Sequence, residues 1–255
     1  MWLDKMERHF YGVQPGVIME GETMENLLPG EVRLSIQEMA ARSLVMAAEP
    51  QLDKESGQVI PGRTGKMINI DASMRKVMKA HENQRIEAEW IYIEPHYSVH
   101  DIQAVTEPLG SYGTWISGSY QRFTNISLAV AAINNTLVWP GGVFSFNDTV
   151  GPRTAERGYM PAPVILMGGS DIDYGGGVCQ LASTLYNAVR QSGLKITERH
   201  QHSKPVPYIE AGQDATVDYG CLDLKFLNDS PGPIIIKAGI SRGKVWVQIL
   251  GRRES

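Results

Sequence analysis

The apolar positions in the first hundred residues predict two helices and one strand. After Pro29-Gly30 they recur at helical spacing, which predicts a helix that is stopped by Pro50. Ser73 is expected to cap a second, short helix. Apolar residues at every second position from 86 to 92 predict a strand. The expected inner faces are Val32, Ile36, Met39, Ala40 and Leu44; Met74, Val77, Met78 and His81; and Ile86, Ala88, Trp90 and Tyr92.

The second half of the chain predicts two amphipathic helices followed by three strands. Asn125 is expected to cap the first helix, which ends at Pro140-Gly141-Gly142, and the second helix runs from about Cys179 to Gly193. The strands are expected over 215–227, 233–240 and 244–250, with a three-residue loop between the last two. The expected inner faces of the helices are Ile126, Ala129, Val130, Ile133 and Leu137, and Leu181, Leu185, Ala188 and Val189.

Glycine and proline interrupt every regular period between residues 94 and 118, and we place a domain boundary there, near residue 105. Helices followed by consecutive strands indicate an α+β fold. The prediction is therefore a small α+β domain over 1–105 and a second domain over 106–255, in which helices pack on a largely antiparallel sheet.

Composition and charge exclude some classes of function. The chain has 255 residues, 42% of them apolar and 20% charged, as in an ordinary soluble globular protein. A formal net charge of −4 and the lack of a long basic run argue against a nucleic-acid partner. Residues 1–7 show neither the basic nor the apolar region of an export signal, so we expect none within this sequence.

Three histidines of the first hundred residues lie outside any catalytic pattern. His81 is expected on a helix face. His96 and His100 are four residues apart, which suits a metal ion only on a helix, whereas Pro95 favours an extended segment. We therefore expect no metal site in this half of the chain.

The strongest local signal is the segment Gly175–Gln180, in which three glycines precede Cys179 at the start of a helix. Glycines allow a tight turn and leave space for a substrate chain. In the first helical turn, free N–H groups and the helix dipole favour a thiolate, which is the nucleophilic form of cysteine. The same N–H groups can stabilise an oxyanion. The alternative is that Cys179 is a small buried residue that packs a helix start against a glycine turn.

A second cluster contains His200 and His202, which point to the same side if the segment is extended. A nucleophilic cysteine needs a histidine as its proton acceptor and donor, and either ring can fill that role. The pair also fits half of a zinc site, completed by Cys179 or an aspartate. A third possibility is a pair of exposed polar residues before a proline-rich turn.

Other polar residues are candidates for supporting roles. Asp214 or Asp223 can orient a histidine, or either can simply pair with a lysine. Cys221 is expected to be a bystander, because it shares one face of its predicted strand with Asp223 and Lys225. Two cysteines do not make a disulfide framework for a chain of this size, although a single bridge stays open. Arg122 and Asn125, just before the first helix, can bind a carboxylate.

Ordered motifs over about residues 120–233 give the C-terminal half a resemblance to VanW-domain proteins. The motifs are Arg122–Asn125, Pro140–Asn147, Val150–Thr154, Gly158-Tyr159, Gly175–Gln180, Ser183–Asn187, His202-Ser203, Asp214–Val217 and Asp223–Phe226. The first hundred residues resemble, more weakly, the peptidoglycan-binding-like domain that often precedes VanW in bacterial envelope proteins.

The resemblance implies a transfer between peptidoglycan stem peptides, since some VanW-domain proteins have been assigned L,D-transpeptidase activity. Cys179 would be the nucleophile, His202 the first and His200 the second choice of base, and Asp214 a further member of the site. No cofactor is implied. The substrate-binding residues would be Arg122, Asn125, Asn147, Gly176, Gly177 and Gln180.

The resemblance also implies an extracytoplasmic protein of the cell envelope, with a membrane anchor possible outside this sequence. The link to vancomycin resistance is by family name. Two other functions stay open: a non-catalytic module that binds peptidoglycan or a wall-synthesis partner, and a zinc hydrolase that uses His200, His202 and a third ligand. The oligomeric state is left open.

Overall fold

The computed structural model describes residues 2–166 and 169–252. Contacts divide the chain into two compact units, an N-terminal unit of Met1–Pro50 and Pro61–Ser98 and a C-terminal unit of Gln51–Ile60 and Val99–Ser255. Helices and largely antiparallel sheets confirm the predicted α+β class. Residues 51–60 belong to the C-terminal unit, although they precede residues 61–98 of the N-terminal unit. The domain boundary near residue 105 stays a prediction.

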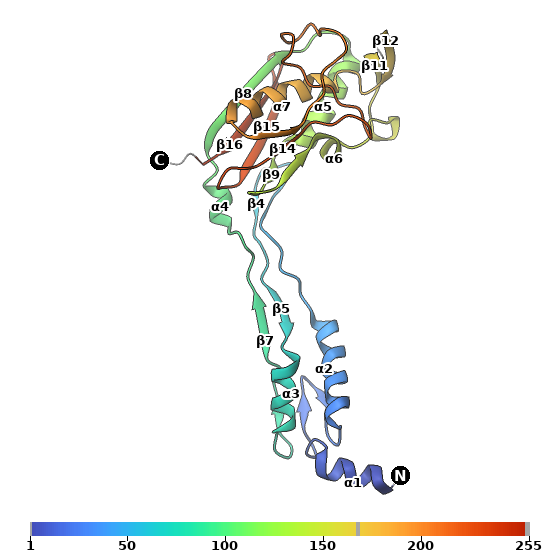
Figure 1. Cartoon of the computed structure of the whole chain (residues 1–255), viewed down its shortest axis with the longest axis vertical. Helices are drawn as coiled ribbons and strands as arrows, with labels where there is room; N and C mark the ends of the chain where they lie inside the picture. The colour runs from blue at the N-terminus through green and yellow to red at the C-terminus, as the bar shows by residue number, and fades with distance from the viewer. Residues whose placement is uncertain (1, 167–168, 253–255) are drawn as a thin grey trace. The chain divides into compact units, whose positions relative to one another are not determined.

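The N-terminal unit packs two helices together beside short strands (Figure 1). Its elements are α1 (Trp2–Tyr11), β1 (Ile18–Met19), β2 (Glu22–Thr23), α2 (Pro29–Ser43), β5 (Gly65–Ile68), α3 (Ile70–Met78), β6 (Arg85–Ile86) and β7 (Trp90–Ile93). Val32, Ile36 and Met39 of α2 enter its core with Val77 of α3, as predicted.

Three local predictions in this unit were wrong. Helix α2 ends at Ser43 rather than near Pro50, because the next residue, Leu44, is extended and 49% exposed. Asn69, not Ser73, caps α3 by accepting a hydrogen bond from the Ala72 N–H group at 3.0 Å. Ser73 is buried inside that helix, where its hydroxyl accepts from a backbone N–H.

The histidine and strand predictions also need correction. His81 lies beyond the end of α3 rather than on its face. The strand expected over residues 86–92 is two strands, β6 and β7, and Tyr92 is exposed. His100 belongs to α4 (Val99–Gln103), a short helix of the C-terminal unit, and not to an extended segment.

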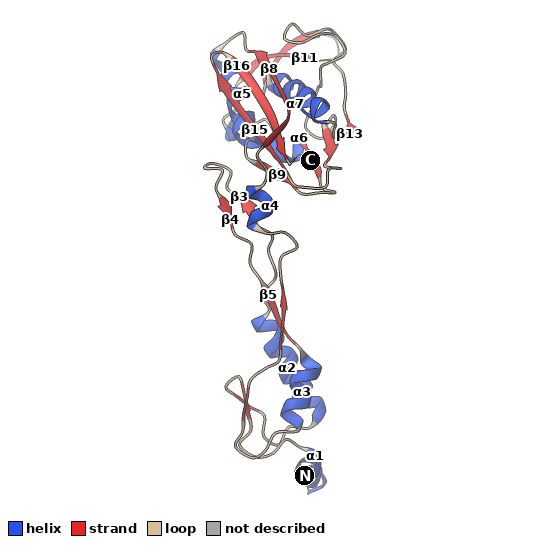
Figure 2. Ribbon diagram, turned by 90° about the vertical axis from the view of Figure 1, so that its left-hand side faces the viewer, coloured by secondary structure: helices blue, strands red, loops and turns tan. Residues whose placement is uncertain are grey.

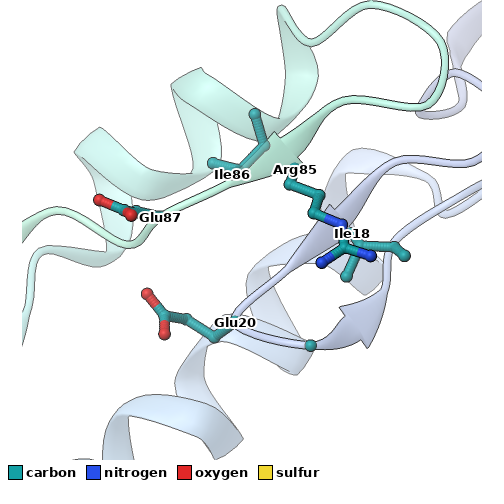
Figure 3. A pocket seen from close by; sticks show the side chains of 6 residues that line it. Ile18, Glu20, Arg85, Ile86 and Glu87 are labelled. Atoms are coloured by element: carbon teal, nitrogen blue, oxygen red, sulfur yellow. The ribbon is translucent and has the colours of Figure 1, made fainter.

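A shallow pocket lies where β1 pairs in parallel with β6 (Figure 3). Figure 3 shows the Arg85 side chain beside Ile18, with Glu20 and Glu87 at the other end of the pocket. Glu20 accepts a hydrogen bond from the Ala88 N–H group at 2.8 Å, so this carboxylate helps to hold the unit together.

The C-terminal unit contains the four-stranded antiparallel sheet β8-β16-β15-β9 and the three-stranded sheet β10-β14-β13. Its strands are β3 (Gln51–Leu52), β4 (Val59–Ile60), β8 (Glu107–Trp115), β9 (Thr136–Val138), β10 (Val143–Ser145), β11 (Pro161–Leu166), β12 (Gly169–Tyr174), β13 (Lys195–Glu198), β14 (Lys225–Leu227), β15 (Ile234–Ser241) and β16 (Lys244–Gly251). Besides α4, its helices are α5 (Tyr120–Ile133), α6 (Phe146–Val150), the 3₁₀ helix Ala155–Arg157 and α7 (Val178–Ser192).

Helices α5 and α7 pack on the four-stranded sheet, where α7 contacts β8 and β16 and α5 contacts β15 (Figure 2). Ile126 and Ile133 of α5, Leu181 and Leu185 of α7, and Val247 of β16 are fully buried in this core. The predicted bounds and inner face of α7 are confirmed, and Gly193 ends the helix in the left-handed conformation with φ 78°.

Four predictions in this unit were wrong. Helix α5 begins at Tyr120, because Ser119 caps it through a 3.3 Å hydrogen bond from the Arg122 N–H group; Asn125 lies inside the helix. The strand expected over 215–227 is reduced to β14. The loop before β16 has two residues, Arg242 and Gly243, since Ser241 pairs with Lys244. Leu137, expected on the first helix, lies on β9.

Of the helices in residues 2–166 and 169–252, none has both the length and the apolar character of a membrane span.

Candidate active site

The turn Gly175–Gly177 connects β12 to α7 and places Cys179 as the second residue of the helix, as predicted. Gly177 precedes the helix with φ 110°, a conformation that side chains disfavour. A Cβ atom on Gly176 would lie 2.6 Å from the Ala162 carbonyl oxygen and 2.7 Å from that of Pro163. The close packing of this turn against β11 therefore requires glycine.

The Cys179 thiol is half-buried and lies against the segment 216–217. Its Sγ is 3.5 Å from the Val217 backbone nitrogen, which donates to it, and 3.6 Å from Thr216 Oγ1. Burial alone would raise the pKa of this thiol. The interaction with the His202 ring, the backbone hydrogen bond at Val217 and the contact with Thr216 outweigh burial and lower the pKa of Cys179 below its ordinary value.

His202 is held by Asp214 at two points. Its ring Nδ1 lies 2.7 Å from Asp214 Oδ2, and its backbone N–H donates to the same oxygen at 2.7 Å. The two side chains are 7% and 9% exposed. Burial lowers the pKa of His202, but the nearby Cys179 sulfur and the Asp214 carboxylate raise it above its ordinary value.

The pKa of Asp214 is lowered although burial opposes this, because His202 donates to the carboxylate and carries charge near it. A raised pKa on His202 and a lowered pKa on Cys179 both favour an imidazolium–thiolate pair. The carboxylate orients the ring and stabilises its charge. A thiol, an imidazole and a carboxylate arranged like Cys179, His202 and Asp214 are able to act as nucleophile, base and orienting group in acyl transfer.

The second histidine, His200, has a different partner. Its Nε2 lies 3.0 Å from Glu198 Oε1, and the other oxygen of Glu198 lies 2.9 Å from Lys225 Nζ. Asp223 is also engaged elsewhere, accepting from the Ser145 hydroxyl at 2.5 Å and from the Asn147 N–H group at 2.9 Å. The structure therefore brings His202 and Asp214 to Cys179, and gives His200 and Asp223 other neighbours.

Three of the predicted substrate-binding residues hold the glycine turn from within the protein. Asn125 donates to the Gly176 carbonyl at 3.1 Å, and Arg122 Nη2 donates to Gln180 Oε1 at 2.7 Å. Gln180 in turn donates to the Trp115 carbonyl at 2.8 Å. Their contact with substrate stays a prediction.

Asn147 lies farther along the chain on α6. Its amide nitrogen donates to the backbone oxygens of Asp218 and Leu222, at 3.0 and 2.8 Å. These bonds shape the loop that precedes β14, and a role of Asn147 in substrate binding also stays a prediction.

Several residues at the site did not stand out in the sequence. Arg199 donates to the Asp214 carbonyl at 2.8 Å, and Ser183 bridges the Cys179 carbonyl and the Ala215 N–H group, at 2.8 and 2.9 Å. Arg199 directly precedes His200, and in an extended segment its side chain points to the side opposite to the two histidines. Ser183 could have been found from its place one turn after Cys179 on α7.

Arg153 and Tyr208 lie within reach of the charge of Cys179, which acts to raise the pKa of each of them. Burial raises the pKa of the Tyr208 hydroxyl, which keeps the phenol protonated near neutral pH. Each of the two residues directly follows a proline in an irregular segment, where no helical or strand periodicity predicts a buried side chain.

A shallow pocket opens beside His202 and Asp214 and gives access from solvent to this side of the site. Its other lining residues are Gln201, Ser203, Lys204, Pro205, Val206, Glu210, Ala211 and Gly212. Cys179 and Cys221 are both free thiols, and Cys221 is exposed. Among the side chains of the described ranges, no three histidine, cysteine or acidic groups gather as a metal site.

The fold and site define a class: α+β proteins in which a thiol stands at the start of a buried helix and an imidazole bonded to a carboxylate lies near it. The chain belongs to the family of VanW-like proteins, since the family model with the description "VanW like protein" matches residues 121–250. The matched range contains all three of these side chains.

Two relatives extend this comparison. The chain is 40% identical over 189 residues to "Uncharacterized protein YoaR" of Bacillus subtilis (strain 168), covering 72% of this chain and 62% of that protein. It is 32% identical over 153 residues to "Vancomycin B-type resistance protein VanW" of Enterococcus faecalis (strain ATCC 700802 / V583), covering 57% and 56%. The chain thus spans less than two thirds of either relative. No solved structure gives a significant match.

Proposed function

We propose that the chain is a cysteine-dependent L,D-transpeptidase that acts on peptidoglycan stem peptides. The observation that carries the proposal is the His202 ring, which is bonded to Asp214 at 2.7 Å and interacts with the Cys179 thiol so that the pKa of this thiol is lowered. Membership of the VanW-like family supports a substrate in the cell wall, as does a relative named for resistance to vancomycin, an antibiotic that acts on the wall.

In the first step, the Cys179 thiolate attacks the carbonyl carbon of a diamino-acid residue in the donor stem. In the first turn of α7, the N–H groups of Val178 and Gln180 donate to the carbonyl oxygens of Gly175 and Gly177, each at 3.0 Å, so the N–H group of Cys179 itself is the one offered to the oxyanion. The C–S bond forms and the C–N bond breaks. The His202 imidazolium gives its proton to the leaving nitrogen, and terminal D-alanine departs.

In the second step, the side-chain amine of an acceptor stem attacks the thioester. Neutral His202 takes the proton from this amine, a new C–N bond forms, and the C–S bond breaks to release the Cys179 thiolate. Asp214 keeps Nδ1 of His202 occupied throughout, so that the other ring nitrogen serves both proton transfers. The two steps balance without an added cofactor.

This function places the chain outside the cytoplasm, where peptidoglycan is assembled. For the N-terminal unit we propose a role in binding peptidoglycan. Its pocket between β1 and β6 exposes two carboxylates and a guanidinium, which offer hydrogen-bond partners to polar glycan or peptide groups.

The experiment is incubation of the protein with muropeptides that carry tetrapeptide stems. The expected products are cross-linked dimers and free D-alanine, which chromatography and mass spectrometry detect. Cys179→Ala should abolish both products, and Cys221→Ala should keep them, because Cys221 is an exposed thiol with its own surroundings. No product from the unaltered protein, or full activity in Cys179→Ala, would refute the proposal.

A second candidate is a non-catalytic module that binds peptidoglycan or a wall-synthesis partner. The half-buried state of Cys179 and its contacts with Thr216 and Val217 favour this candidate, because they are also what a packed structural thiol would show. It predicts that iodoacetamide modifies Cys179 slowly and that His202→Ala leaves this rate unchanged.

A further inference from the structure

Arg153 is a buried cation without a hydrogen-bond partner near the candidate site. Its two terminal nitrogens, Nη1 and Nη2, are buried and find no acceptor among the described residues. A buried, unpaired donor costs about 1–3 kcal/mol, and more when it carries charge. Such a group is retained where a ligand or a function satisfies it.

The surroundings of Arg153 fix its guanidinium without satisfying it. The group lies over the rings of Phe146 and Tyr219, at 5.7 and 5.9 Å from their centroids. Aromatic faces attract the cation but accept no conventional hydrogen bond. The N–H groups lie in the guanidinium plane, where their geometry matches a planar, bidentate acceptor such as a carboxylate.

The stem of Arg153 packs on the turn that carries the nucleophile. A Cβ atom on Gly175 would lie 2.8 Å from Arg153 Cβ and 2.7 Å from its Cγ, which is closer than side chains normally approach. Gly175 lies four residues before Cys179, and the charge of that thiolate reaches Arg153. The free guanidinium edge therefore belongs to the surroundings of the nucleophile.

The charged groups near Arg153 do not supply the missing acceptor. Burial lowers the pKa of Arg153, and Asp218 and Asp223 oppose this only through their charge. Asp223 is engaged by the Ser145 hydroxyl and the Asn147 N–H group. The other arginine at the site, Arg122, differs because it already donates to Gln180 at 2.7 Å.

We propose that Arg153 binds a carboxylate of the substrate beside Cys179, and that this carboxylate belongs to the residue that leaves. The inference rests on the proposed function for the identity of the substrate. In a donor stem the terminal carboxylate is attached to the same carbon atom as the nitrogen of the bond that Cys179 breaks. A cation near the nucleophile thus selects stems in which the leaving residue is the last one.

The test compares two alkylating agents of similar size, the anion iodoacetate and the neutral iodoacetamide, with modification of Cys179 followed by mass spectrometry. The ratio of the iodoacetate rate to the iodoacetamide rate should fall about tenfold or more in Arg153→Gln, which is about 1.4 kcal/mol. Arg157→Gln, which removes an exposed arginine of the same segment, should keep the ratio. An unchanged ratio in Arg153→Gln would overturn the proposal.

A second measurement uses the unaltered protein and so does not depend on how a variant folds. N-acetyl-D-alanine should slow the alkylation of Cys179 by iodoacetamide, and N-acetyl-D-alaninamide, which lacks the carboxylate, should not. Equal protection by both compounds, or by neither, would overturn the proposal. These readouts need no turnover. A protein without transpeptidase activity can still show carboxylate binding, and an active enzyme without it would refute the role of Arg153 alone.

Discussion

His202 sets the reactivity of Cys179 more than any other side chain in contact with it. Burial opposes the thiolate, and the interaction with His202 is the largest favourable influence on the lowered pKa of Cys179. The raised pKa of His202 and the lowered pKa of Cys179 both favour the imidazolium–thiolate form of the pair. The two groups titrate as a coupled pair, so His202 helps to set the pH window in which the thiol ionises.

The first prediction concerns this window. The rate of Cys179 alkylation by iodoacetamide rises with pH as the thiol ionises, and the lowered pKa places that rise below pH 9. In His202→Gln the rise should move to higher pH, because burial then opposes the thiolate without the nearby positive charge. The measurement is the pH profile of alkylation at Cys179.

His200→Gln is the matched control for this profile. Since His200 is bonded to Glu198, its loss should leave the midpoint of the rise near that of the unaltered protein. An equal shift in both variants would contradict the assignment of His202 as the partner of Cys179.

The local sequence pattern could name Cys179 but could not rank the histidines, and it was the family resemblance that placed His202 first. The glycines before the cysteine and the apolar periodicity after it are local signals, and they were enough to predict where the helix starts. His200 and His202 share a face in any extended segment, so local geometry treats them alike. Only Asp214, twelve residues beyond His202, distinguishes them by its 2.7 Å contact, and such a partner is set by tertiary structure.

The bounds of helix α7 could be predicted because two signals agree: a glycine at each end of the helix and apolar residues at helical spacing between them. Helix α5 shows where such signals compete. Asn125 is a typical capping residue, yet its amide is buried and bonds to Met160 and Gly176, which lie far along the chain. Ser119 fills the capping position instead.

The strand expected from residue 215 failed for a similar reason. Ala215 and Val217 are buried, as on the inner face of a strand, but their backbone groups bond to side chains of α7 rather than to a neighbouring strand. The partners are the Ser183 hydroxyl and the Cys179 sulfur. Residues buried against a helix can therefore show the same alternating sequence pattern as residues buried in a sheet.

The glycine turn provides the next prediction. Gly176→Ala places a methyl group 2.6 and 2.7 Å from two carbonyl oxygens of β11, and the backbone must shift to accept it. We expect a loss of about 1–3 kcal/mol in the free energy of unfolding, together with slower alkylation of Cys179. Urea unfolding and the alkylation rate measure the two effects.

Gly232→Ala is the control in the same unit, since nothing lies within 4 Å of the added methyl group. Its stability should stay within about 0.5 kcal/mol of the unaltered protein. A Gly176→Ala variant as stable and reactive as this control would show that the turn tolerates a side chain.

The C-terminal unit includes the hairpin of β3 and β4, which comes from residues 51–60, between the two segments of the N-terminal unit. Leu52 and Val59 pack against a small cluster that includes Ile235, and Asn135 donates to the Lys54 carbonyl at 2.8 Å. Lys54 also bonds through its ammonium group to the Thr136 hydroxyl. The unit that carries the candidate site is therefore discontinuous in sequence.

This leads to a prediction about shortened chains. A fragment of residues 106–255 lacks the hairpin and α4, and it should lose about 2–3 kcal/mol of stability, or more, from the lost apolar burial and hydrogen bonds. A chain with residues 51–60 joined by a short flexible linker to 99–255 should keep them, because β4 contacts α4. Urea unfolding of both chains tests this, and equal stability would contradict it.

The order β8-β16-β15-β9 has a consequence for how the protein acquires its shape during synthesis. Strand β8 pairs with β16, which ends at Gly251, so the sheet under α7 is incomplete until residue 251 has left the ribosome. Pairings between such distant segments form slowly, and meanwhile apolar strands stay exposed to aggregation. Cys179 thus reaches its folded surroundings on α7 only after these late pairings have formed.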